Sequence, residues 1–92
     1  MVSQFETRLF INGKFVDAST PARFSCWNPS NDALLTDQLH EATKEDVDAA
    51  VAAARAAFPG WAATRTSRRR DILLKFADLI EAHAEEIATL EV

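Results

Sequence analysis

Two short, mostly apolar runs lie near the start of the chain, residues 8–11 (RLFI) and 14–16 (KFV). Between the runs lies Asn12-Gly13, the strongest short signal for a two-residue type I′ turn, since both central residues of that turn need positive φ. We therefore predict a β-hairpin here, in which Phe10 and Phe15 each supply a buried face.

A second and weaker pair of strands follows. Residues 24–27 (FSCW) alternate, residues 28–32 (NPSND) form a turn cluster in which Pro29 fixes φ, and residues 34–39 (LLTDQL) can return as a strand. Residues 17–22 form a loop between the two predicted hairpins, which together span about residues 8–39. Two small hairpins are only marginally stable without a covering layer, so they need helices or another surface on top.

The polar pattern changes to helical spacing at Thr43. This residue is a good N-cap, Glu45 and Asp46 place negative charge in the first turn, and Thr43-x-x-Asp46 resembles a capping box with Asp in place of Glu. An apolar stripe follows, made mostly of small side chains: Val47, Ala50, Val51, Ala54 and Phe58. Because Pro59-Gly60 is a helix-ending signal, we predict a helix over about residues 43–58.

A second helix is predicted over about residues 66–91, beginning at Thr66 or Ser67. Its apolar face comprises Leu73, Phe76, Ala77, Ile80, Ala84, Ile87 and Leu90, widened by Leu74, Leu79 and Ala88. So broad a face indicates two packing neighbours. The stripe continues to Leu90 without a Gly, Pro or basic stop signal, which suggests a chain cut short. We expect an α+β segment, two hairpins followed by two helices, that forms a single incomplete domain over residues 1–92.

Composition and charge restrict the function classes. Ninety-two residues with 48% hydrophobic and 26% charged side chains suit one small globular domain. The net charge of −4 makes nucleic acid a poor partner, and the single cysteine allows no internal disulfide. Neither a signal peptide nor an apolar run long enough to cross a bilayer is recognisable. We therefore expect a cytoplasmic protein with no membrane or nucleic-acid partner.

Candidate catalytic and metal-binding residues are few. Cys26 has no histidine near it in sequence to lower its pKa, so we interpret it as a buried or half-buried strand residue. His40 is interpreted as loop surface and His83 as a packing or edge residue. The acidic side chains of the second helix are interpreted as a solvated face, and they are Asp71, Asp78, Glu81 and Glu85. The two glycines, Gly13 and Gly60, cannot build a phosphate-binding loop.

The only basic run is Arg68-Arg69-Arg70, with Arg65 just before it and Trp61 nearby. A helix places these three arginines about 100° apart, which divides their charge over several faces. Surface or structural ion pairing is therefore favoured over nucleic-acid binding. The residues present define a scaffold without visible catalytic machinery.

Four phrases in order resemble the N-terminal segment of the NAD(P)-dependent aldehyde dehydrogenase family. They are LFINGKFVDAS, FSCWNPSNDALL, EATKEDVDAAVAAARAAFPGW and SRRRDILLKFADLIEAHAEEIATLE. Within them, Phe10 to Phe15 match the opening Ile-Asn-Gly phrase, Asn28-Pro29 match the Asn-Pro turn, and Leu73 to Glu81 match the Leu-x-x-x-Ala-Asp-Leu-Ile-Glu helix. Asn31-Asp32 stand where the family has Gly-Glu, a minor turn variation.

The resemblance implies part of a larger α/β, Rossmann-like enzyme that oxidises an aldehyde to a carboxylic acid with NAD or NADP. It also implies that the catalytic and coenzyme-binding residues lie outside this segment, so we assign no catalytic, cofactor-binding or metal residue here. The backbone oxygens of Cys26 and Trp27 match positions that hold a monovalent cation in some members, but backbone ligation requires no particular side chain. The implied partners are the remainder of the enzyme chain and further copies in a homo-oligomer. The alternative is a small helical interaction or dimerisation module without catalysis.

Overall fold

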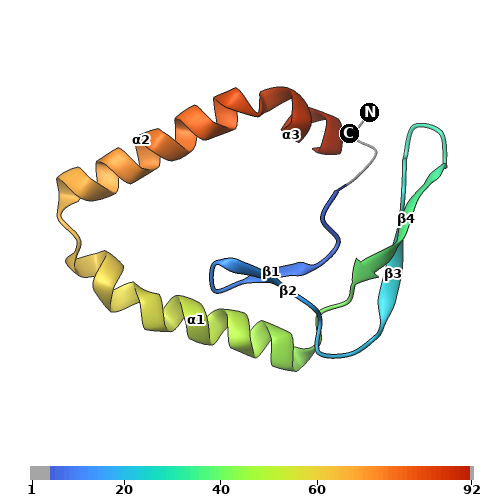
Figure 1. The fold of residues 1–92 in the computed structure, drawn as a ribbon, viewed down its shortest axis with the longest axis horizontal. Helices are drawn as coiled ribbons and strands as arrows, with labels where there is room; N and C mark the ends of the chain where they lie inside the picture. Colours follow the sequence, from blue (N-terminus) through green and yellow to red (C-terminus); the bar gives the residue numbers. More distant parts are fainter. Residues whose placement is uncertain (1–4, 92) are drawn as a thin grey trace. The chain divides into compact units, whose positions relative to one another are not determined.

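The computed structural model of the chain describes residues 5–91 (Figure 1). Residues 1–4 and 92, the ends of the predicted domain, lie outside the described residues. The described chain divides into two compact units, residues 5–56 and residues 57–91. The first unit contains two hairpins and most of the first helix, and the second contains the end of that helix and two further helices.

The first hairpin joins β1 (Leu9–Ile11) to β2 (Lys14–Val16) in an antiparallel pair. Asn12 and Gly13 at the turn have φ of 56° and 78°, as the type I′ prediction requires. Phe10 and Phe15 lie directly opposite each other, with ring centroids 5.0 Å apart in an edge-to-face pair. They remain 62% and 48% exposed, so the prediction that each supplies a buried face is wrong. Alternation along the strands turns the opposite face inward instead, and its half-buried residues are Leu9, Ile11 and Val16.

The second hairpin joins β3 (Arg23–Trp27) to β4 (Leu34–His40), also antiparallel and in a separate two-stranded sheet. Its turn is organised by Asn28, whose backbone carbonyl accepts the Asp32 N–H at 2.8 Å and whose side-chain oxygen accepts the Ser30 N–H at 2.9 Å. Both strands were predicted within one residue. The pairing is irregular on either side of Cys26, which the alternation did not indicate.

Helix α1 (Lys44–Ala63) begins where predicted but runs through Pro59 and Gly60, so the predicted end at Phe58 is wrong. Proline removes a single N–H from the ladder, and the alanines on both sides of Pro59-Gly60 are strong helix formers. The helix ends instead at Ala63, and the next residue, Thr64, donates its hydroxyl to the Gly60 carbonyl at 2.7 Å and its backbone N–H to the Trp61 carbonyl at 3.1 Å. These bonds satisfy carbonyls at the end of the helix.

The predicted helix over residues 66–91 is two helices, α2 (Thr66–Ala82) and α3 (Ala84–Glu91), and this part of the prediction is wrong. The break lies at His83, with φ −111° and ψ 21°. The His83 N–H is shared between the carbonyls of Leu79 and Ile80, so the last turn of α2 tightens toward 3₁₀ geometry. No proline or glycine marks this position, and helical spacing of the apolar residues continues across it.

No hydrophobic side chain of residues 5–91 is buried, and the single buried residue in that range is Asp46 at 9% exposure. The large apolar side chains of the three helices remain 37–65% exposed; they are Val47, Val51, Phe58, Trp61, Ile72, Leu73, Leu74, Phe76, Leu79, Ile80, Ile87 and Leu90. Over the described residues the architecture is α+β, as predicted, with three helices in place of two. Its helices carry apolar faces that nothing in either unit covers.

Candidate functional site

The most densely hydrogen-bonded point in residues 5–56 is the start of α1. The Asp46 carboxylate accepts the Thr43 N–H at 2.9 Å and the Ser19 N–H at 3.1 Å to each of its oxygens. In return the Thr43 hydroxyl lies 3.4 Å from the Asp46 N–H as its acceptor. The predicted capping box is therefore present, and Ser19, 27 residues away, completes what we call the Asp46 cluster (Ser19, Thr43 and Asp46).

The Asp46 cluster is built to keep a carboxylate ionised. Hydrogen bonds from the Thr43 backbone, then the Ser19 backbone, lower the pKa of Asp46, while burial acts in the opposite direction. The helix N-terminus also favours negative charge at this point. A carboxylate whose oxygens are occupied by four donor groups is a poor general base, and the cluster fastens the loop to the helix.

His40 lies next to this cluster and was wrongly interpreted as loop surface. It is the last residue of β4, and its side chain is only 8% exposed. The ring Nδ1 of His40 accepts the Ala18 backbone N–H at 2.9 Å, and the backbone N–H of His40 donates to the Thr7 carbonyl at 3.0 Å. Sequence distance hid this role, because Ala18 precedes His40 by 22 residues and no local motif links them.

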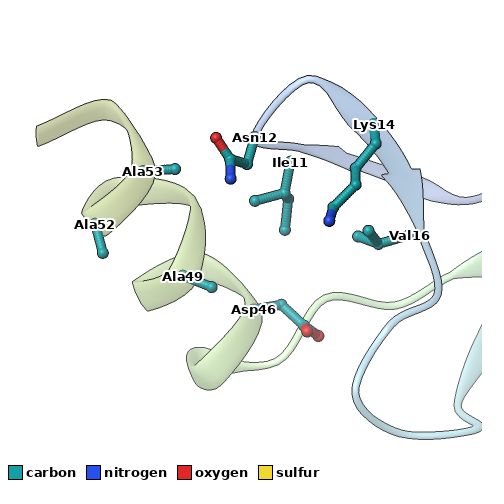
Figure 2. A pocket seen from close by; sticks show the side chains of 8 residues that line it. All are labelled: Ile11, Asn12, Lys14, Val16, Asp46, Ala49, Ala52 and Ala53. Carbon is teal, nitrogen blue, oxygen red and sulfur yellow. The ribbon is translucent and has the colours of Figure 1, made fainter. Parts of the chain in front are cut away.

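A groove lies between the first hairpin and α1 (Figure 2). It has a volume of about 540 Å³ and is lined by Ile11, Asn12, Lys14, Val16, Asp46, Ala49, Ala52 and Ala53. A smaller hollow of about 180 Å³ adjoins it on the other side of Ile11 and Asp46. Small alanine side chains leave this space open. The lining offers no nucleophile with a base beside it, so the groove has the character of a packing surface.

The remaining candidate residues do not assemble into a catalytic site. Cys26 is exposed, so its interpretation as a buried or half-buried residue is wrong; four of the five residues of β3 are exposed, on both faces of the strand. Strand register places Cys26 opposite Thr36 and His40 opposite Arg23, so no histidine approaches the thiol along the hairpin. His83 is exposed at the α2–α3 break, with its Nδ1 3.6 Å from Glu86.

Ion pairing was favoured for the basic run Arg68-Arg69-Arg70, and the structure shows such a pair at Arg70. Arg70 pairs with Asp71 at 3.2 Å, and Arg69 is half-buried on α2. In the first unit, the Arg8 guanidinium bonds to Glu6 at 2.9 Å and lowers the pKa of Glu6 to about 2. Both pairs are exposed, and exposed ion pairs contribute little to stability.

Over residues 5–91, no three His, Cys, Asp or Glu side chains converge as a metal site would require. No helix in the same range has the length and apolar character needed to cross a bilayer.

The residues of this segment do not fit a dinucleotide. Gly13 occupies a hairpin turn and Gly60 lies inside α1, whereas a phosphate cradle requires glycines between a strand and the N-terminus of a helix. The two grooves described above are lined mainly by aliphatic side chains.

Comparison with known proteins identifies the class. Residues 15–92 match the aldehyde dehydrogenase family. The chain is 51% identical over 88 residues to aldehyde dehydrogenase 1 of Tanacetum cinerariifolium, covering 94% of this chain and 17% of that protein. It is 46% identical over 84 residues to an aldehyde dehydrogenase of Emericella nidulans, covering 90% of this chain and 17% of that protein. A probable methylmalonate-semialdehyde/malonate-semialdehyde dehydrogenase [acylating] of Dictyostelium discoideum, named as mitochondrial, is 40% identical over 84 residues, which cover 91% of this chain and 16% of that protein.

The chain belongs to the aldehyde dehydrogenase family. It spans about a sixth of the length of the relatives it matches, so it corresponds to one segment of those enzymes. The family prediction made from the four sequence phrases is confirmed.

Proposed function

We propose that these residues are the N-terminal scaffold of an aldehyde dehydrogenase, which in its full length oxidises an aldehyde to a carboxylic acid with NAD or NADP. Family membership supports the reaction class. The names of the relatives support aldehydes as the substrate class without fixing one aldehyde, because one of them carries a semialdehyde name and the others do not.

The observation that carries the scaffold role is the exposed apolar surface of the helices. Leu73 and Phe76 on α2 are each 59% exposed, and Leu90 on α3 is 56% exposed. Monomeric proteins rarely leave contiguous apolar surface of this kind uncovered. We propose that residues 1–92 are a single incomplete domain, part of the coenzyme-binding domain, whose helices pack on the nucleotide-binding sheet of the same enzyme.

The chemistry is proposed to reside outside this segment. In the family reaction a cysteine thiolate attacks the aldehyde, hydride passes to the coenzyme, and water hydrolyses the resulting thioester. Cys26 has no base beside it within its hairpin, which argues against that role. The contribution of these 92 residues is to cover and support the sheet on which the coenzyme binds.

Assembly and location are proposed from the family and the composition together. The full-length enzyme is a homo-oligomer, and neither nucleic acid nor membrane is a partner. A cytoplasmic location is part of this proposal. Mitochondrial relatives from Leishmania tarentolae and Dictyostelium discoideum make this the first assignment to test, by locating the tagged protein in cells.

The test is an exchange experiment. In what we call the exchanged enzyme, the segment of the Tanacetum cinerariifolium relative that matches this chain over 88 residues is replaced by the residues of this chain. We expect the exchanged enzyme to form NAD(P)H in the presence of an aldehyde, and the purified 92-residue chain to form none. A matched control carries Cys26→Ser in the exchanged enzyme and should keep full activity.

Turnover by the 92-residue chain alone would overturn the scaffold proposal. Loss of activity in the Cys26→Ser control would also overturn it, because this result would place a reacting group inside the segment. A folded but inactive exchanged enzyme would favour the alternative, a helical interaction or dimerisation module, and sedimentation of the chain would then show a discrete dimer.

A further inference from the structure

The loop that follows β2 is held by two titratable side chains through consecutive backbone N–H groups. The Ala18 N–H donates to His40 Nδ1 at 2.9 Å, and the Ser19 N–H donates to both oxygens of Asp46 at 3.1 Å. These bonds connect the loop to the end of β4 on one side and to the start of α1 on the other. The loop is therefore held at both points while the His40 ring is neutral and Asp46 is ionised.

The bond at His40 fixes the state of the imidazole. A backbone N–H is always a donor, so Nδ1 must be an acceptor and the ring must be neutral, with its proton on Nε2. Protonation of Nδ1 would place the ring N–H opposite the Ala18 N–H, so two donors would face each other and the Ala18 N–H would lose its acceptor. Because the His40 side chain is only 8% exposed, water cannot readily replace the lost bond.

Charged groups of both signs lie around His40. Asp17 Oδ1 on the loop lies 3.9 Å from Nε2, and Arg23 stands opposite His40 on β3. Glu41 follows His40 in sequence. The backbone N–H of His40 donates to the Thr7 carbonyl, and the residues on either side of Thr7, Glu6 and Arg8, form an exposed ion pair. The remaining charge is Asp46 at the start of α1. Its carboxylate is already occupied by Ser19 and Thr43.

We propose that His40 is a proton-sensitive latch, whose neutral ring holds residues 17–19 in place and whose protonation releases the loop at Ala18. Release removes the bond at Ala18, one of the two points, Ala18 and Ser19, at which these side chains hold the loop. The Asp46 fastening remains, because carboxylates stay ionised well below the pH at which histidines protonate. The latch is independent of the proposed enzymatic function, since it involves no substrate or coenzyme.

The experiment is site-resolved amide hydrogen exchange by NMR on the 92-residue chain, at about pH 7.5 and about pH 5.5, on either side of the range in which histidines titrate. Protection factors are corrected for the pH dependence of intrinsic exchange. We expect protection of the Ala18 N–H to fall about fivefold on acidification, the effect of losing one hydrogen bond, while protection of the Ser19 N–H is retained.

Two variants separate the latch from general loosening. His40→Gln keeps an acceptor that does not titrate and should abolish the pH dependence at Ala18, whereas His40→Ala should lose protection at both pH values. His83→Gln is the matched control at the other histidine and should behave as the parent chain does. Equal protection of Ala18 at both pH values, or no protection at the higher pH, would overturn the proposal, as would retained pH dependence in His40→Gln.

Discussion

Phe76 offers a sharp test of the idea that α2 is one side of an interface. Its ring is 59% exposed in the described chain, although it lies on the apolar face of α2. A phenylalanine side chain buries about 200 Å² when fully covered, so about 120 Å² of Phe76 remains for a partner surface to cover. At about 25 cal/mol per Å², covering this area stabilises the enzyme by about 3 kcal/mol.

The perturbation is Phe76→Ala in the exchanged enzyme, with Lys75→Ala as the matched control on the exposed, polar side of the same helix. We expect Phe76→Ala to lower the free energy of unfolding by about 3–5 kcal/mol, the range for a phenylalanine removed from a core. Lys75→Ala should stay within about 0.5 kcal/mol of the parent.

The assay is urea denaturation followed by tryptophan fluorescence, with the midpoint and slope compared between variants. If Phe76 faces solvent in the complete enzyme, the two variants will be equally stable. That result would refute the interface reasoning, because no partner surface would then cover α2.

Further predictions concern the local structure of the chain itself. Thr43→Ala removes the side-chain half of the capping box and should destabilise the start of α1 by about 1 kcal/mol, measured by amide exchange in its first turn, whereas Thr43→Ser should retain the cap. Because folding lowers the pKa of Asp46, its ionised carboxylate stabilises the folded chain above about pH 4, and this stabilisation is lost as the pH falls through the pKa that Asp46 has in the folded state. Circular dichroism between neutral and acidic pH should show α1 loosening, and Asp46→Asn should remove this pH dependence. Gly13→Ala should destabilise the first hairpin by about 1–2 kcal/mol, since φ there is +78° although no atom lies within 4 Å of the added Cβ. Gly60→Ala should instead stabilise α1 by about 0.5–1 kcal/mol, because the added Cβ meets no atom within 4 Å and the residue lies in helical backbone. Urea denaturation compares Gly13→Ala with Gly60→Ala, and a change of the same sign in the free energy of unfolding of both variants would contradict the argument.

The sequence was sufficient where local chemistry determines structure. Asn12-Gly13 specified the first turn because positive φ is required at both positions, and Thr43-x-x-Asp46 specified the start of α1 because the two residues satisfy each other's backbone donors. Family membership was also accessible, since four phrases in fixed order carry more information than any one of them.

The end of α1 and the break at His83 depend on a balance between helix-breaking and helix-forming residues, which local sequence patterns do not show. Pro59-Gly60 is a helix-ending signal, but α1 continues to Ala63. The alanines near this pair favour the helix by more than the one backbone hydrogen bond that proline removes. The break at His83 has no Gly or Pro, and the apolar spacing passes through it unchanged.

The candidate site was the least predictable part of the chain. Ser19 reaches Asp46 across 27 residues, and His40 reaches Ala18 across 22, so both contacts depend on how the first hairpin folds back toward α1. A polar residue in a predicted loop gives no signal of such a contact. This is why His40 was assigned to the surface although its side chain is almost fully covered.

The central claim is that the apolar faces of α2 and α3 are completed by the rest of an aldehyde dehydrogenase. Its most direct test compares amide hydrogen exchange of α2 and α3 in the 92-residue chain and in the exchanged enzyme. Helices that pack on a partner gain protection toward that of the whole protein, whereas exposed helices open locally. We predict rapid exchange of both helices in the chain alone and strong protection in the exchanged enzyme. Equal and rapid exchange in both proteins would contradict the claim.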